Sequence, residues 1–148
     1  MTNAATKPAA MTAQEIDAFL AREFPQIHVH GPLYRIEQVG HGHATMRLTY
    51  HDSQLRPGGT LSGPAMMTLS DLVFYVAILA SIGPVALAVT TNLNFNFLRK
   101  PAPRDLIASC KLIKLGRRLA VGDIALASDG SPDLVAHVTG TYALPDQK

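Results

Sequence analysis

A single carboxylate stands inside the longest apolar stretch of the sequence. Asp71 lies in the run 62–82, where nearly every other residue is apolar or small. Charged side chains are rarely buried unless they are paired or functional, and no Lys or Arg occurs between Gly58 and Leu98 to form a local ion pair. A structural capping or pairing role is the alternative, but the missing cation favours a carboxylate that takes part in proton chemistry.

The stretch before Asp71 predicts a long helix that starts at a glycine-rich loop. Ser62 suits the N-cap position, where its hydroxyl can accept a backbone N–H, and Pro64 has the preset φ of an early helical residue. The helix should end near Gly83 and, being apolar on all sides, should be buried nearly all round. For Ser62 a cap is favoured over a substrate contact. A nucleophile comes last, because the spacing differs from G-x-S-x-G.

The remaining pattern predicts one more helix and six strands. Thr12 opens a capping box with Glu15, and Pro25 ends that first helix. The strands are expected at Leu33–Val39, Ala44–Tyr50, Leu87–Leu98, Asp105–Leu115, Arg118–Ser128 and Leu134–Leu144. An antiparallel sheet curled around the long helix would cover it and give an α+β domain. The open sheet edges favour a dimer made by sheet extension.

Two strands carry further expectations. In 118–128 the alternation of apolar residues slips at Gly122, which predicts a β-bulge there. In 87–98 the face of Thr90 also carries three asparagines, and the opposite face carries Val89, Thr91, Leu93 and two phenylalanines. Asparagine is depleted in strands, so Asn94 either lines a substrate channel or belongs to an ordinary solvent-facing side.

Length and composition limit the class of protein. The 148 residues fit one domain, which we place at 12–148 after a disordered tail at 1–11. A net charge of +2 is too small to indicate nucleic acid. The lone Cys110 excludes an intrachain disulfide and fits a reducing compartment. Without a signal-peptide pattern, and with the apolar run 72–82 too short to span a bilayer, we expect a cytoplasmic protein that binds no membrane.

Other chemistry-bearing residues are weaker candidates. The H-x-H pairs at 28–30 and 41–43 lack a third ligand, so surface histidines are favoured and no metal is expected. Cys110 reads as a small core residue. A basic set surrounds two adjacent turns and either is solvated surface or binds phosphate groups. Its members are Arg99, Lys100, Lys114, Arg117 and Arg118.

Four motifs, in this order of elements, resemble the hotdog-fold thioesterases, in particular the phenylacetate-pathway (PaaI-type) acyl-CoA thioesterases. The motifs are Gly59-Thr60-Leu61-Ser62-Gly63, Leu69-Ser70-Asp71, Asn94-Phe95-Asn96-Phe97-Leu98-Arg99 and Gly116-Arg117-Arg118-Leu119-Ala120-Val121. The resemblance covers roughly 33–145. It implies a sheet wrapped around a central helix, a homodimer or homotetramer with sites at the subunit interface, and hydrolysis of an acyl-CoA. No cofactor is implied, because CoA belongs to the substrate.

By position, the resemblance gives Asp71 the role of general base or nucleophile. It gives Gly63 the backbone amide that polarises the thioester carbonyl, as a helix N-terminus can. Two positions depart from the family. Pro64 replaces a glycine and lacks an amide, and Arg56 stands where Asn or Gln is common. The candidate substrate-binding residues are Arg56, Ser62, Asn94, Tyr75, Arg99, Arg117 and Arg118.

The acyl-CoA thioesterase is the first hypothesis, and two alternatives follow it. A hotdog dehydratase or hydratase would need a catalytic His, which neither 62–64 nor the residues after Asp71 contain. A non-catalytic acyl-CoA binding or sensing protein would tolerate Pro64 and Arg56, but would have no reason to bury Asp71 beside a thioester. Aromatic and medium-chain acyl groups both remain open, because Met66, Met67, Phe74 and Tyr75 suit either a pocket or the core.

Overall fold

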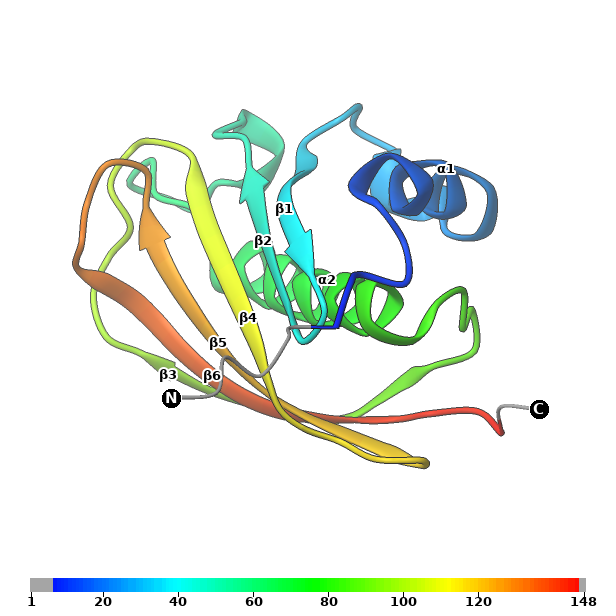
Figure 1. Cartoon of the computed structure of the whole chain (residues 1–148). Helices are drawn as coiled ribbons and strands as arrows, with labels where there is room; N and C mark the ends of the chain where they lie inside the picture. Colours follow the sequence, from blue (N-terminus) through cyan, green and yellow to red (C-terminus); the bar gives the residue numbers. More distant parts are fainter. Residues whose placement is uncertain (1–6, 147–148) are drawn as a thin grey trace.

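The computed structural model describes residues 7–146, and it folds as a curved antiparallel sheet around one long helix (Figure 1). The helices are α1 (Ala13–Glu23) and α2 (Gly63–Ile82), with short 3-10 turns η1 (Pro25–His28) and η2 (Asp52–Gln54). The strands are β1 (Tyr34–Gly40), β2 (His43–Leu48), β3 (Val89–Phe97), β4 (Leu106–Leu115), β5 (Leu119–Ser128) and β6 (Leu134–Ala143). Their order in the sheet is β1-β2-β4-β5-β6-β3. The α+β hotdog fold is confirmed.

The central helix α2 begins and ends as its sequence predicts. The Ser62 hydroxyl caps it by accepting the Ala65 N–H at 3.2 Å, and Gly83 ends it with φ +95°. By length and apolar composition α2 could cross a membrane, yet most of it is buried inside the domain.

Burial of α2 on all sides was predicted, and this is wrong for its first half. Pro64, Met67 and Thr68 are exposed and Asp71 is half-buried, because the strands cover the helix on its other sides. These four residues follow the three- and four-residue spacing of one helical face. We call this face the open stripe of α2. Within one chain, the face of α2 that carries Asp71 is therefore not covered by the sheet.

Two glycines make room in the sheet for the ring of Phe74, which is fully buried. Gly122 on β5 and Gly140 on β6 lie opposite each other. A Cβ at Gly122 would lie 2.9 Å from Phe74 Cζ, and one at Gly140 would lie 2.5 Å from Leu93 Cδ2. The sheet can therefore close over the helix at this point only if both positions lack side chains.

The bulge predicted at Gly122 lies on the neighbouring strand instead. The register shifts between Leu112 and Lys114 of β4, directly opposite Gly122 and Val121. The inward alternation of β5 continues unbroken through Gly122, because this residue faces Phe74. The apparent slip in the sequence arose because a core position carries no side chain.

Strand β3 forms one edge of the sheet and contains an irregularity of its own. The register with β6 shifts between Thr90 and Asn92, so Thr91 is the extra residue. The two faces predicted for this strand therefore hold only beyond Thr91, and Thr90 joins the inner side. Asn94 is exposed, which agrees with the solvent-facing alternative.

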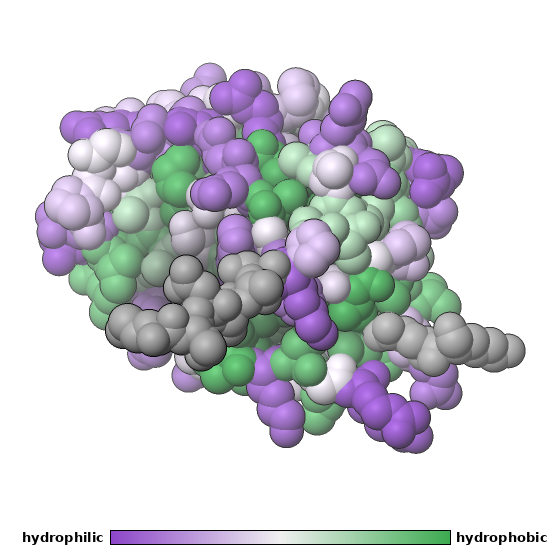
Figure 2. Space-filling view, viewed as in Figure 1, coloured by the Kyte–Doolittle hydropathy of each residue, from purple (hydrophilic) through white to green (hydrophobic). Residues whose placement is uncertain are grey.

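Exposed Val89, Phe97 and Leu98 add apolar surface along this strand and just beyond it, and green surface shows on the left of Figure 2, where β3 and β6 lie in Figure 1.

Helix α1 packs its apolar stripe against the body. Ile16, Phe19 and Leu20 are buried, and the capping box of Thr12 and Glu15 forms as predicted. Residues 1–6 of the expected tail lie outside the described residues. Ala10 and Met11, its last residues, pack on the domain: the Ala10 N–H donates to Ala80 O at 2.7 Å, and Met11 is buried.

Candidate functional site

Asp71 is held by two hydroxyl groups that reach it from different strands. Thr90 of β3 donates to Asp71 Oδ1 at 2.5 Å, and Tyr142 of β6 donates to the same oxygen at 2.7 Å. Tyr142 also lies 3.1 Å from the Asp71 carbonyl oxygen. Among residues 7–146, Oδ2 has no hydrogen-bond partner. One carboxylate oxygen is thus fixed, and the other can accept a proton or attack an electrophile.

Tyr142 can act only as a donor in this arrangement. Burial, reinforced by the negative charge of Asp71, raises the pKa of its hydroxyl well above the usual range. Its ring packs on Phe74 with centroids 4.6 Å apart and stacks on Tyr75 at 6.3 Å. The phenol is therefore protonated and rigid, which fixes the orientation of the carboxylate.

A hollow of about 220 Å³ opens beside Asp71. Tyr75, one of the predicted substrate contacts, lines it and donates its hydroxyl to Ala86 O at 3.0 Å. Burial, and then the charge of Glu23, raises the pKa of Tyr75. We call this the carboxylate hollow. Its lining residues are Glu23, Phe24, Asp71, Tyr75, Ala86, Ala88, Val89, Thr90 and Tyr142.

Gly63 lines a different hollow, of about 480 Å³, at the N-terminus of α2. Its N–H has no hydrogen-bond partner among residues 7–146 and stands at the positive end of the helix dipole. Arg56, Arg99 and Lys100 lie around it, and Leu61, Met66, Phe97 and Leu98 provide apolar surface. We call this the basic hollow, because Arg56, Arg99 and Lys100 line it and none of the described carboxylates does.

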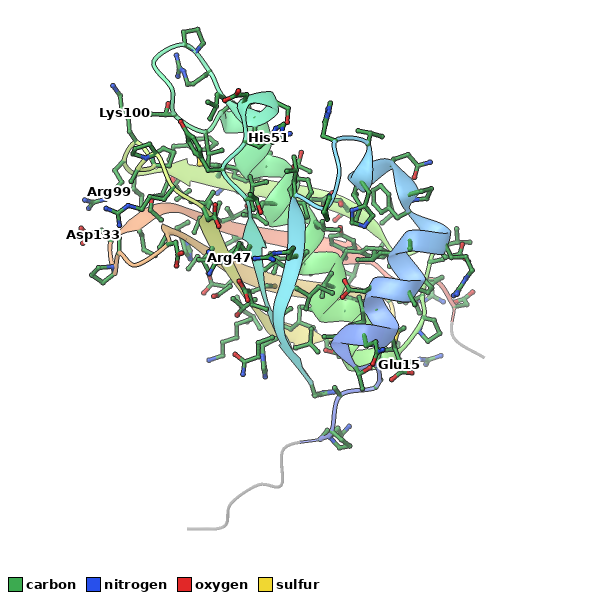
Figure 3. The ribbon with its side chains drawn as sticks, turned by 90° about the horizontal axis from the view of Figure 1, so that it is seen from above. Glu15, Arg47, His51, Arg99, Lys100 and Asp133 are labelled. Atoms are coloured by element: carbon green, nitrogen blue, oxygen red, sulfur yellow. The ribbon has the colours of Figure 1, made fainter. Side chains whose placement is uncertain are left out.

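The two arginines of the basic hollow differ in how they are held. Arg99 donates to the Leu134 carbonyl at 3.0 Å and lies 3.7 Å from Asp133. Arg56 is exposed, and its guanidinium has no partner among the described residues. Figure 3 shows Arg99, Asp133 and Lys100 together at one end of the molecule, far from α1. The cations of this hollow can therefore turn toward an anion.

Arg117 and Arg118 lie elsewhere, in a hollow of about 660 Å³ with Ser81 and Ile82 of the C-terminal end of α2. That end of a helix carries the negative end of the dipole and favours cations over bound anions. The predicted basic set is thus divided between the two ends of α2. Ser62 serves as the cap, and neither Ser62 nor Asn94 lines any of these three hollows.

The structure separates the two residues expected to do the chemistry. Gly63 and Asp71 are eight residues apart on one helix, which is about 12 Å along its axis. They border different hollows, so one chain does not bring them to the same substrate atom. Both hollows touch β3, however: Val89 and Thr90 at its start line the carboxylate hollow, and Phe97 at its end lines the basic hollow.

Four residues around Asp71 were not identified from the sequence. Thr90 was placed on the outer face because the bulge at Thr91 has no clear sequence signal. Tyr142 could have been suspected, since a buried tyrosine hydroxyl needs a partner, but its partner is 71 positions away. Phe24 was predicted to belong to the apolar stripe that packs the first helix on the body, and no role was predicted for Glu23.

Two further observations concern Cys110 and the possible metal ligands. Burial raises the pKa of Cys110 to about 12, so this thiol is unreactive. Within residues 7–146 no group of three His, Cys, Asp or Glu side chains could hold a metal ion.

Comparison with known proteins gives consistent matches. A sequence model of the thioesterase superfamily matches residues 58–134. A solved structure from Silicibacter sp., provisionally assigned as a thioesterase, is 45% identical, with a TM-score of 0.84 over 93% of this chain and 94% of that one. A mutant of the phenylacetic acid degradation protein PaaI from Thermus thermophilus is 25% identical, with a TM-score of 0.65 over 74% of this chain and 91% of that one.

A third structure shares the fold and has a ligand. It is a Streptococcus mutans protein bound to acetyl-CoA, 22% identical, with a TM-score of 0.68 over 78% of this chain and 90% of that one. The resemblance to hotdog thioesterases, PaaI among them, is therefore confirmed.

Proposed function

The chain belongs to the thioesterase superfamily, and from that premise we propose that it hydrolyses an acyl-CoA at a site shared between two copies of the chain. Asp71 of one copy acts as general base or nucleophile, and the Gly63 amide of the other copy polarises the carbonyl. The observation that carries this proposal is the oriented carboxylate. Thr90 and Tyr142 hold Oδ1, and Oδ2 lies beside a hollow without a partner among residues 7–146.

The sheet edge supplies the geometry for a shared site. Strand β3 has one neighbour only, and the two hollows lie at its opposite ends. If two copies of β3 pair antiparallel about a two-fold axis, the start of one strand lies beside the end of the other. The carboxylate hollow of one copy then faces the basic hollow of its partner. Such a dimer would also cover the apolar surface of β3.

The chemistry follows from these groups. As general base, Asp71 Oδ2 takes a proton from water, and the resulting hydroxide attacks the thioester carbon. As nucleophile, Oδ2 attacks that carbon directly. In both routes the carbonyl oxygen becomes negative beside the Gly63 N–H, the C–S bond then breaks, and the thiolate of CoA takes up a proton. In the nucleophilic route this step leaves a mixed anhydride on Asp71, which water then cleaves. The products are a free acid and CoA.

The basic hollow suits the anionic part of the substrate. Arg56, Arg99 and Lys100 border it without a carboxylate, next to the positive end of α2. CoA carries phosphate groups, which arginine and lysine bind well. The hotdog protein bound to acetyl-CoA is consistent with a ligand of this class. We therefore place the CoA phosphates here and not at Arg117 and Arg118.

Thiol release from a panel of aryl, short-, medium- and long-chain acyl-CoAs tests the reaction. We expect turnover of at least one substrate and a loss of about a hundredfold or more in Asp71→Asn, the scale for removing a general base. Asp52→Asn, an exposed carboxylate on η2, is the matched control and should keep full activity. Wild-type protein that binds acyl-CoA without releasing thiol would refute the enzyme and favour a binding protein.

A further inference from the structure

The carboxylate hollow has a wall contributed by a segment outside the part of the chain that matches the superfamily. Glu23 and Phe24, at the C-terminal end of α1, line it together with Asp71, whereas the superfamily match starts at residue 58. The segment that matches the superfamily model does not include this wall, so membership of the superfamily does not fix its residues. A feature of that kind is suited to setting which acyl group the hollow accepts.

Aromatic rings close the hollow on the side of α1. Phe24 meets Tyr75 edge to face, with ring centroids 6.3 Å apart and planes at 64°, and Tyr75 stacks on Tyr142. Phe24 is 38% exposed as a residue, which leaves surface that can pack on a ligand. The small side chains of Ala86 and Ala88 also line the hollow. A cavity of about 150 Å³ holds one benzene molecule, so the 220 Å³ of this open hollow are enough for a compact group beside Asp71.

The charges on this wall are all of one sign. Glu23 and Asp71 line the carboxylate hollow, and no Lys or Arg does. The basic hollow shows the reverse, with three cations and no carboxylate. Glu23 has only an exposed pair with its neighbour Arg22, at 3.3 Å. An acyl group that carries a carboxylate would therefore meet two negative charges in the lining, where the described residues place no cation, because Arg22 lies outside it.

We propose that Glu23 and Phe24 are specificity-determining residues: Phe24 limits the length of the acyl group, and Glu23 excludes acyl groups that carry a negative charge. This inference rests on the proposed function, since it concerns the acyl end of the same substrate. It assigns to the carboxylate hollow a compact, uncharged acyl group. Helix α1 is then part of the substrate site as well as a packing element.

Truncation of Phe24 tests the length limit. We expect Phe24→Ala to raise the ratio of kcat/KM for decanoyl-CoA over that for butanoyl-CoA by roughly tenfold or more, because pocket discrimination by methylene groups is of this size. Phe24→Leu keeps more apolar volume and serves if the alanine variant is unstable; it should raise this ratio less. Val29→Ala, at an exposed apolar residue outside the hollow, is the control. An unchanged ratio in both Phe24 variants would overturn the length limit.

Neutralising Glu23 tests the charge rule. Glu23→Gln should raise the ratio of kcat/KM for succinyl-CoA over that for butanoyl-CoA by roughly fivefold, the Coulomb effect of one nearby charge in a solvated site, and Glu23→Lys should raise it further. Asp17→Asn removes a carboxylate from the same helix outside the hollow and should leave the ratio unchanged. Equal ratios in wild type and both Glu23 variants would overturn the rule.

Failure of the proposed function gives a different result. If wild type releases no thiol from any acyl-CoA, the hydrolase is refuted, and the same ratios are then read from dissociation constants of non-hydrolysable thioether analogues. Selective changes in those constants would uphold the assignment of Glu23 and Phe24. Uniform changes would overturn it.

Discussion

Tyr142 illustrates how a single hydroxyl can hold the carboxylate of Asp71 in one orientation. It donates to Asp71 Oδ1 at 2.7 Å, and its raised pKa keeps the proton in place. We predict that Tyr142→Phe lowers kcat about tenfold with little change in KM, because the carboxylate loses one of two donors and with it a defined orientation. Steady-state kinetics over a pH series would check this. Unchanged kcat across the pH range would show that Thr90 alone positions Asp71.

Cys110 offers a test at the residue scale that needs no substrate. Burial raises the pKa of its thiol to about 12, so at mildly alkaline pH it is both covered and protonated, and the thiolate is the reactive form. We predict that a thiol reagent labels the native protein at least about a hundredfold more slowly than the urea-unfolded protein. Equal rates would place Cys110 at the surface.

Sequence reasoning identified the carboxylate that we propose to react, but not the residues that hold it. Asp71 is conspicuous because a carboxylate in an apolar helix breaks the local pattern. Thr90 and Tyr142 fit their strands as ordinary residues, and their roles depend on a bulge and on strand register. Such contacts join residues far apart in the chain, so local spacing could not reveal them.

At the scale of elements, the sheet closes over α2 where Gly122 and Gly140 face Phe74. We predict that Gly122→Ala lowers the free energy of unfolding by about 1–3 kcal/mol, the usual cost of overpacking, because its Cβ would lie 2.9 Å from the ring. Urea denaturation would measure this. The matched test is Phe74→Leu combined with Gly122→Ala.

That double variant should be less destabilised than the sum of its two single variants, since the smaller side chain removes the clash. Strict additivity would mean that the glycine is needed for another reason.

Of the elements themselves, the two helices and six strands could be predicted from periodicity and caps. The positions of the bulges could not be predicted. A glycine at a core position and an extra residue in a strand both interrupt the alternation of apolar side chains, so the sequence does not distinguish them.

At the scale of the whole molecule, the distribution of charge favours one end of α2 for the phosphate groups of the proposed substrate. The basic hollow is at the N-terminus of α2, and Arg117 and Arg118 are at the other end. We predict that Arg99→Gln raises KM for an acyl-CoA several-fold, with a steeper effect at low salt, while Arg117→Gln changes it by less than about twofold. The reverse result would move the phosphates to the other end of the helix.

The separation of Gly63 from Asp71 also belongs to this scale. The fold places them in different hollows, and only an assembly can unite them. The sequence predicted dimerisation from open sheet edges. The structure adds that the two hollows lie at opposite ends of one edge strand. A chain that works as a 15.9 kDa monomer would be incompatible with this arrangement.

Subunit complementation tests the shared site most directly. Asp71→Asn removes the carboxylate, and Gly63→Pro replaces the amide hydrogen with the proline ring. The backbone accommodates this change, because Ser62 already has the extended conformation (φ −78°, ψ 163°) of a residue before proline, and a Cβ at position 63 would come no closer than 4.0 Å to Phe97 Cζ. Each variant alone should be inactive. In purified heterodimers, one of the two sites combines an intact Asp71 with an intact Gly63, so we predict about half of the wild-type activity. Heterodimers as inactive as their parents would contradict a site shared between subunits.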